Sequence, residues 1–244
     1  MPHESRIEAG IEIIPLCDAV GPMGAAIRKP LPEMFRGASF PADAEWVLHF
    51  HCYLLLAAGR TILVDTGVGG ADSPAASWAP VPGRLVAEMA AAGVKPADVD
   101  AVVITHLHSD HAGGCVAGGA PVFANARHLI QRAELDWVSR PMREQVVAPL
   151  GDRVEAVSGD VEPFPGVRLL HTPGHTPGHQ CVAVGDLVLS GDVLHHPVQL
   201  DDPTITYVYD EDPAEAVRSR KAVLSRARVL ATAHFAEPFT SLSS

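Results

Sequence analysis

The sequence lacks the features that would place it at a membrane or in a secreted class. No apolar run approaches the roughly 20 residues that a membrane-spanning helix needs, and the polar first ten residues, with Glu4 and Glu8, are unlike a signal peptide. Aromatic residues are only 5% of the 244, yet 47% are hydrophobic, which is enough for a globular core. We therefore expect a cytoplasmic protein in which residues 1–244 form a single domain.

Positive charge is scarce as well. The chain has 18 Lys and Arg residues against 29 Asp and Glu residues, which gives a formal net charge of −11 with neutral histidines. Such a surface repels phosphate backbones and anionic lipids, so we expect no nucleic-acid and no membrane partner. The expected partner is a small-molecule substrate, and an apolar N-terminal flap could pack on a second copy to form a homodimer.

Closely spaced cysteines are missing too. Cys17, Cys52, Cys115 and Cys181 are scattered along the chain, which excludes a disulfide-stapled small fold and a CxxC motif. The chain has 13 histidines, however, and several of them cluster.

Short apolar runs separated by Gly and Pro predict strands that precede and follow helices in both halves, which indicates the α/β class. Residues 21–45, with four prolines between Gly21 and Pro41, are expected to form a flap whose apolar Met34, Phe35 and Phe40 are either exposed or part of a substrate lid. The predicted strands are Ile11–Leu16, Trp46–Leu56, Thr61–Val64, Ala101–Ile104, Val122–Ala124, Val167–Leu170, Cys181–Val184, Leu187–Leu189 and Val229–Ala231. The predicted helices are Arg84–Ala92, Arg127–Val138, and one that begins at the capping box Asp212-Pro213-Ala214-Glu215 and ends near Ala227.

The tightest histidine cluster follows the predicted strand Ala101–Ile104. His106 and His108 are two residues apart, so in an extended segment both imidazoles point to one side and can reach one metal ion. Asp110 and His111 come after the chain begins to turn and can face a second ion. Further ligand-type residues follow other predicted strands: His175, Asp192 and His234.

Five motifs occur in one order along the chain: Asp65-Thr66-Gly67, the HxHxDH stretch from His106 to His111, Pro173 to His179, Ser190-Gly191-Asp192, and His234. In this the sequence resembles the metallo-β-lactamase fold superfamily. The resemblance implies a four-layer αββα sandwich with the metal site at one edge, between the sheets. It implies that His106, His108 and His175 hold one ion, that Asp110, His111 and His234 hold the other, and that Asp192 bridges both. It also implies that Asp65 orients a ligand histidine, where the alternative is a plain turn, and that His179 supports its loop.

Imidazole and carboxylate ligands suit Zn²⁺, and the same ligands accept Mn²⁺, Fe²⁺ or Co²⁺. Two divalent ions outweigh the charges of Asp110 and Asp192, so the centre stays positive and lowers the pKa of bound water. The predicted chemistry is attack of a metal-bound hydroxide on a carbonyl or phosphoryl centre, with Asp110 near the attacking water.

The superfamily resemblance extends to branches of hydrolases. Dizinc lactonases share the ligand set, and the stretches Asp192 to Gln199, Asp212-Pro213 and His234-Phe235 look more like the branch of methyl parathion hydrolase and related esterases and lactonases. We expect a hydrolase of esters or lactones, with phosphotriesters as a side reaction. The alternatives are a β-lactam hydrolase and a non-catalytic metal-binding scaffold.

Two histidine pairs stay open. Several lactonases place a tyrosine shortly after the bridging aspartate, where this chain has His195 and His196, so either could donate a hydrogen bond to the substrate, or both could face solvent. His49 and His51 alternate along a predicted strand and share one face, as a pocket wall or in a structural role.

Overall fold

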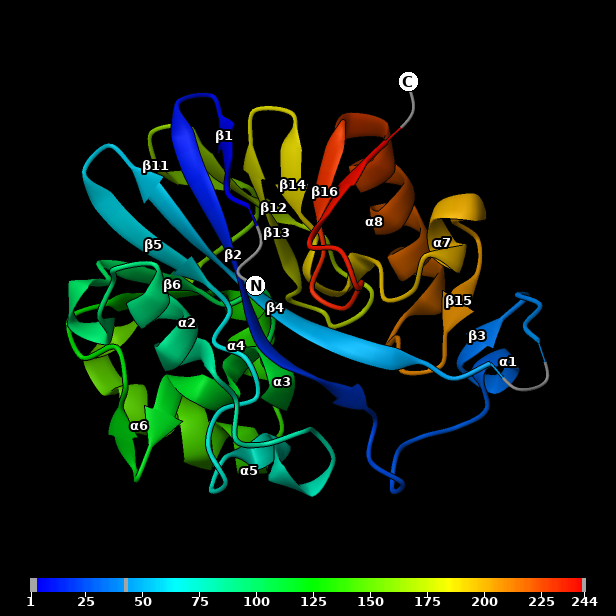
Figure 1. Ribbon diagram of the computed structural model, residues 1–244, viewed down its shortest axis with the longest axis horizontal. Helices are drawn as coiled ribbons and strands as arrows, with labels where there is room; N and C mark the ends of the chain where they lie inside the picture. The colour runs from blue at the N-terminus through cyan, green and yellow to red at the C-terminus, as the bar shows by residue number, and fades with distance from the viewer. Residues whose placement is uncertain (1–3, 42–43, 243–244) are drawn as a thin grey trace.

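The computed structural model describes residues 4–41 and 44–242, which form two β-sheets packed against each other with helices on both outer sides (Figure 1). The strands of the first sheet, in spatial order, are β1 (Arg6–Glu8), β2 (Ile11–Pro22), β4 (Val47–Ala57), β5 (Arg60–Val64), β6 (Ala101–Val103), β9 (Arg127–Gln131) and β10 (Val154–Val157). Those of the second are β11 (Val161–Phe164), β12 (Val167–His171), β13 (Gln180–Val184), β14 (Leu187–Leu189), β16 (Val229–Ala231) and β17 (Phe239–Ser241). The predicted α/β sandwich is confirmed.

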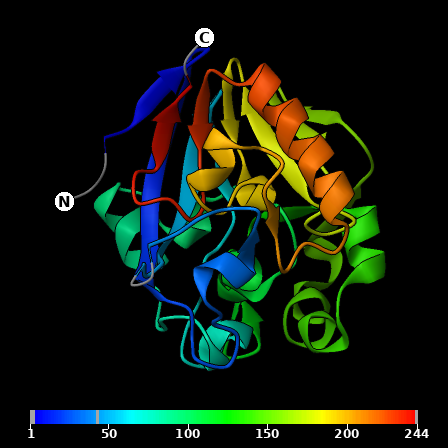
Figure 2. The ribbon, with the colours of Figure 1, turned by 90° about the vertical axis from the view of Figure 1, so that its right-hand side faces the viewer.

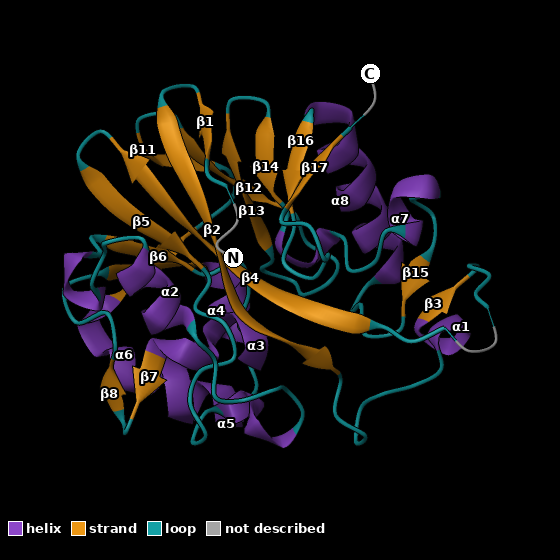
Figure 3. Cartoon of the chain, in the orientation of Figure 1, coloured by secondary structure: helices purple, strands orange, loops and turns teal. Residues whose placement is uncertain are grey.

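Short strand pairs and helices complete the fold (Figure 3). The pairs are β3 (Phe35–Arg36) with β15 (Thr206–Tyr207), and β7 (Val116–Ala117) with β8 (Ala120–Pro121). The helices are α1 (Leu31–Met34), α2 (Leu85–Ala91), α3 (Ser109–Ala112), α4 (Arg132–Trp137), α5 (Arg140–Met142), α6 (Ala148–Leu150), α7 (Val198–Asp201) and α8 (Pro213–Arg226). Within the described residues, no helix is both long and apolar enough to cross a membrane.

Side-chain alternation along the strands builds the layers. On β4, Tyr53 and Leu55 pack into the cluster between the two sheets, whereas Leu54 joins the cluster beneath α2 and α4. This is the period-2 pattern of a strand that is covered on both faces. On the other side of the molecule, α8 packs Val223 against the second sheet (Figure 2).

Two of the predicted elements are wrong. The segment Arg127–Val138 is not one helix, because its first five residues form β9, parallel to β6, and only then does α4 begin. Leu129 packs between the sheets and Ile130 packs under the helices, so burial on both faces overrides helix propensity. Residues 122–124 form no strand but a turn after β8, and Phe123 is apolar because it fills the core.

The helix predicted from Asp212 is confirmed. The Asp212 carboxylate accepts a hydrogen bond from the Glu215 backbone N–H at 3.0 Å, and α8 continues to Arg226. The helix predicted over Arg84–Ala92 is also present as α2, and it is followed by Gly93 with φ +77°.

The predicted flap is more ordered than a loop. Its first residues end β2, and it continues through α1 and β3, which pairs with β15. Phe35 and Met34 are fully buried in a cluster with Tyr207, so neither is an exposed loop residue, and Phe40 is half-buried against them. Positions 42 and 43 of the predicted flap lie outside the described residues.

A buried aspartate anchors the loop that follows β5. Asp18, at a bulge in β2, accepts hydrogen bonds from the Val68 and Leu85 N–H groups, each at 2.7 Å. A Cβ atom at Gly67 or Gly83 would lie 2.1 or 2.3 Å from this carboxylate, which explains why both positions are glycine. The segment between these glycines carries Trp78, whose indole N–H donates to Ser109 at 3.0 Å.

One buried histidine gives the fold a pH dependence. His128 on β9 is fully buried, and burial lowers its pKa to about 4, whereas in the unfolded chain it would titrate near 6.5. Protonation below pH 6.5 therefore favours the unfolded chain, and stability falls as pH falls from 6.5 toward 4.

We expect the wild type to lose about 2 kcal/mol more stability between pH 7.5 and pH 5 than a His128→Leu variant does. Urea unfolding of both proteins at the two pH values measures this difference. Effects common to both proteins, such as acid titration of other histidines, cancel in the comparison. An equal loss in wild type and variant would refute the assignment.

Candidate metal centre

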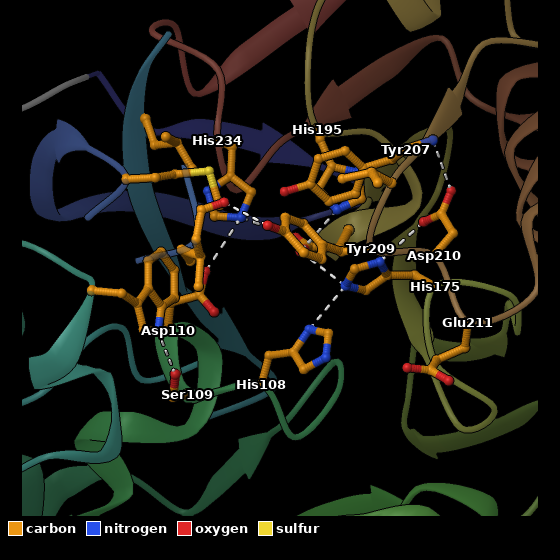
Figure 4. Close-up of a pocket in the computed structure, with 16 residues that line it drawn as sticks. His108, Ser109, Asp110, His175, His195, Tyr207, Tyr209, Asp210, Glu211 and His234 are labelled. Atoms are coloured by element: carbon orange, nitrogen blue, oxygen red, sulfur yellow. Dashed lines mark hydrogen bonds and ion pairs between the residues drawn. The ribbon is translucent and has the colours of Figure 1, made fainter. Parts of the chain in front are cut away.

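Ligand-type side chains from both sheets converge at one end of the strands. His106 and His108 follow β6, while His175 follows β12, Asp192 follows β14 and His234 follows β16. Figure 4 shows His108, Asp110, His175 and His234 around a common space. All seven residues predicted as metal ligands are brought together there, and all but the half-buried His108 are buried.

The first group contains three imidazoles. His108 Nδ1 lies 2.9 Å from both His106 Nε2 and His175 Nε2. Asp192 Oδ2 lies 3.3 Å from His175 Nε2 and 3.7 Å from His106 Nε2. Two ligands bound to the same ion at roughly 2.0–2.2 Å are themselves about 3.3–3.6 Å apart, so the spacing of the four residues suits one ion.

The second group faces the other oxygen of the same aspartate. Asp192 Oδ1 lies 3.1 Å from His111 Nε2 and 3.2 Å from His234 Nε2. Asp110 Oδ2 lies 3.4 Å and 3.5 Å from the same two nitrogens. Asp192 therefore stands between the two groups with one oxygen toward each.

The polar atoms of this centre are suited to cations. His111 Nε2 and Asp192 Oδ1 are fully buried, and neither has a hydrogen-bond partner among the described residues although they are 3.1 Å apart. Buried lone pairs without donors are costly, and a shared cation between them removes that cost. The donor set, five imidazoles and two carboxylates without sulfur, fits divalent ions such as Zn²⁺.

Burial and neighbouring charges shift the pKa values of the histidines and of Asp192 in this centre. Burial, helped by His111 and His108, holds the pKa of His106 well below its usual value. Burial alone would also lower the pKa of His111, but the carboxylates of Asp192, Asp110 and Asp65 raise it well above 6.5. For Asp192, burial would raise the pKa, yet His111 and His234 hold it well below 3.8.

Asp65 and His179 form hydrogen bonds with the ligand-type residues from behind. Asp65, with φ +58° directly after β5, brings Oδ2 to 2.8 Å from His111 Nδ1 and accepts the Thr105 N–H through Oδ1. This geometry favours the orienting role over the plain turn. His179 Nε2 accepts the backbone N–H of Asp192 at 3.0 Å, and its Nδ1 lies 2.8 Å from Thr172 Oγ1.

A cavity of about 410 Å³ opens onto the centre. Its apolar side is lined by Met23, Ile27, Leu48 and Trp78, and its polar side by the metal-facing residues together with Tyr209. His195 lies in this cavity (Figure 4). His196 is not among the lining residues and packs against Phe35, Phe40 and Trp46.

Comparison with known proteins identifies the family. The family model described as the metallo-beta-lactamase superfamily matches residues 49–234. The chain belongs to this superfamily. The motif order seen in the sequence is therefore that of true members, and the predicted family is confirmed.

Relatives that resemble this chain include N-acyl homoserine lactonases. An N-acyl homoserine lactonase of Bacillus cereus is 31% identical over 197 residues, which are 72% of this chain and 76% of that protein. One from a Bacillus species is 36% identical over 159 residues, which are 59% of this chain and 60% of that relative. The prediction of a lactonase-like, metal-dependent hydrolase is confirmed at the level of the family.

Solved structures share the fold. A hydrolase of the beta lactamase superfamily named AbOPH has a TM-score of 0.82 at 22% identity, and the match covers 100% of this chain and 94% of that one. AidC, a dizinc quorum-quenching lactonase solved with a product, has a TM-score of 0.77 at 19% identity, with 99% and 97% covered.

Sequence reasoning missed Glu134, a buried acid on α4. Its carboxylate accepts hydrogen bonds from the Leu107 N–H at 2.8 Å, the Thr176 hydroxyl at 2.6 Å and the Gly178 N–H at 3.0 Å. Leu107 lies between His106 and His108, and Thr176 follows His175, so Glu134 joins the two loops of the first group. The residue has no motif around it, and only the approach of α4 to both loops reveals the contact.

Asp210 and Arg220 were also missed. Asp210 Oδ1 lies 3.1 Å from His175 Nδ1, so it orients this imidazole from behind. Arg220 on α8 is fully buried, donates to the carbonyls of Val193 and Ile205, and lies 3.8 Å from Asp210. A charged residue in a helix normally indicates an exposed face, so sequence alone gave no signal for this one.

We expect Glu134→Ala to lower metal affinity by roughly 10–100-fold, because both ligand loops lose their common acceptor. Competition titration with a chromogenic chelator measures the change. Glu134→Gln, which keeps one acceptor oxygen, should lose less, and Glu144→Ala on the exposed surface serves as the control. Wild-type affinity in Glu134→Ala would show that the loops hold their positions without this residue.

Proposed function

We propose that this protein is a dinuclear metal-dependent hydrolase that opens lactones and cleaves related carboxylic esters. The ligand assignment is the one expected from the sequence: His106, His108 and His175 for one ion, Asp110, His111 and His234 for the other, and Asp192 shared. The observation that carries the proposal is the position of Asp192, whose two oxygens each face one group at 3.1–3.7 Å. When bound, a pair of divalent ions would supply an activated water molecule and a Lewis acid for the substrate carbonyl.

The chain's own residues complete this chemistry. Asp110 lies at the cavity beside His111 and His234, so its carboxylate can take the proton of the attacking water. As water oxygen adds to the carbonyl carbon, the ring C–O bond breaks and the leaving oxygen takes up that proton. The product of a lactone is then the hydroxy acid.

His195 is the proposed donor to the substrate carbonyl. It is buried in the cavity with Nε2 3.2 Å from Asp192 Oδ2, and its ring packs on Tyr207 at a centroid distance of 3.9 Å. Burial lowers its pKa to about 4, so the imidazole is neutral at pH 7 and keeps one N–H to donate. Among the sequence candidates, His196 packs against Phe35 and Phe40 of the flap instead.

The cavity favours a substrate with an apolar arm. Met23, Ile27, Leu48 and Trp78 form one wall that an acyl chain can cover. N-acyl homoserine lactones, the substrates in the relatives' names, combine such an arm with a lactone ring. Phosphotriesters share the need for an activated water and remain the proposed side reaction.

Metal-loaded protein should hydrolyse an N-acyl homoserine lactone, more slowly an aryl ester, and lose both activities with a chelator. Asp110→Asn should lower kcat at least 100-fold, because it removes both a ligand and the proton acceptor. Paraoxon and a β-lactam are assayed beside them. Inert protein with two ions bound would favour the scaffold alternative, and turnover of the β-lactam alone would favour that hydrolase.

His195→Ala should lower kcat/KM for the lactone about 10–100-fold at unchanged metal content, because a transition-state hydrogen bond is lost. His196→Ala, the neighbouring residue outside the cavity, is the matched control and should keep wild-type kcat/KM. Metal analysis of both variants accompanies the kinetics. A His195→Ala protein with reduced metal content would instead place His195 among the ligands.

A further inference from the structure

A second cluster of ligand-type side chains lies outside the metal centre, on β2 and β4. Cys17 of β2 is directly opposite His51 of β4 in the sheet register, and His49 is two residues from His51 on the same strand. Cross-strand partners and residues two apart share one face of a sheet. The sheet therefore presents one thiol and two imidazoles side by side.

The distances are close to those of a metal site. Cys17 Sγ lies 3.8 Å from His49 Nδ1, and one ligand atom from each of the three residues lies within 4.8 Å of the others. Bond lengths of about 2.3 Å to sulfur and 2.0–2.1 Å to nitrogen give ligand separations of roughly 3.3–3.6 Å in a tetrahedral site. A contraction of up to about 1.5 Å by side-chain rotation closes the cluster around an ion.

The hydrogen bond of His51 fixes the tautomer that a metal ligand needs. Its Nε2 lies 2.9 Å from the carbonyl oxygen of Phe235, and a carbonyl only accepts, so Nε2 carries the proton. In the neutral ring, Nδ1 then carries the lone pair that a metal ion requires. A ligand histidine that donates its other N–H to a carbonyl is the usual arrangement in metal sites.

We propose that Cys17, His49 and His51 bind a third metal ion, with water completing a tetrahedral site. The thiolate separates this site chemically from the nitrogen and oxygen centre, because sulfur favours Zn²⁺ and other soft or borderline ions over Mn²⁺. The half-buried Cys17 and His49 leave a route for the ion from solvent. The inference is independent of the proposed lactonase activity.

An ion at this site would stabilise the position of the nearby residue His234. The His49 carbonyl lies 2.9 Å from His234 Nδ1, and the His51 N–H donates to the Ala233 carbonyl at 2.9 Å. An ion that ties β2 to β4 at these residues would therefore hold the backbone that orients His234. We expect its binding to raise the melting temperature of the protein.

Titration with Co²⁺ tests the site by a signal that the nitrogen and oxygen centre cannot give. A thiolate bound to Co²⁺ produces an intense charge-transfer band in the near ultraviolet. The metal-free wild type should bind three equivalents, with this band, and Cys17→Ala should bind two, without it. Cys52→Ala is the matched control, since Cys52 neighbours His51 on β4 but packs on the opposite face, and it should keep the band.

A second measurement needs only the wild type. Cys17 is half-buried while the other three cysteines are buried, so a thiol reagent should modify Cys17 first. Zn²⁺ beyond two equivalents should slow this reaction at least tenfold. Absence of the band in wild type, its persistence in Cys17→Ala, or an unchanged modification rate with excess Zn²⁺ would each overturn the proposal.

Discussion

The structure depends on how buried charge is balanced around Asp192. Its carboxylate and that of Asp110 are buried among five imidazoles at the base of the cavity, where an unpaired ion of either sign costs free energy. Asp192 faces both groups, so imidazoles on both sides balance its negative charge, and its backbone N–H donates to His179 Nε2. The ligand-type residues follow strands of both sheets and lie around Asp192. The two sheets must therefore pack in their correct relative positions before the centre can form.

Buried polar side chains behind the ligand-type residues stabilise the positions of the loops that carry them. Glu134 joins the loops that carry His106 and His175 from the side of the first sheet. From the side of the second sheet, Asp210 contacts His175 and Arg220 donates to the Ile205 carbonyl. Each of these charged groups would destabilise the core alone. Glu134 and Asp210 accept hydrogen bonds or face a histidine, and Arg220 donates to carbonyls through Nε and Nη1 while its Nη2 faces Asp210 at 3.8 Å. The same contacts that stabilise the fold therefore orient the centre.

The ligand-type residues could be predicted because each follows a short apolar strand. In a contiguous motif such as His106 to His111, the spacing along the chain already indicates which side chains point to the same side. Glu134, Arg220 and the Cys17 cluster could not, because their roles arise from contacts between distant segments. The segment from Arg127 was wrongly predicted to be one helix for a related reason. Its burial on both faces comes from sheet neighbours, and nothing local distinguishes a buried strand from the buried side of a helix.

The anchoring of the loop after β5 has a consequence for how the substrate range could change. Asp18 fastens this loop at Val68 and Leu85, and the glycines beside it admit no side chain. Between these two fixed points the chain places Trp78 in the lining of the cavity. Away from Trp78 and Gly69, which contact the stretch from His108 to Gly113, substitutions in this interval replace no predicted metal ligand. Selectivity can therefore diverge through this interval while the chemistry is kept.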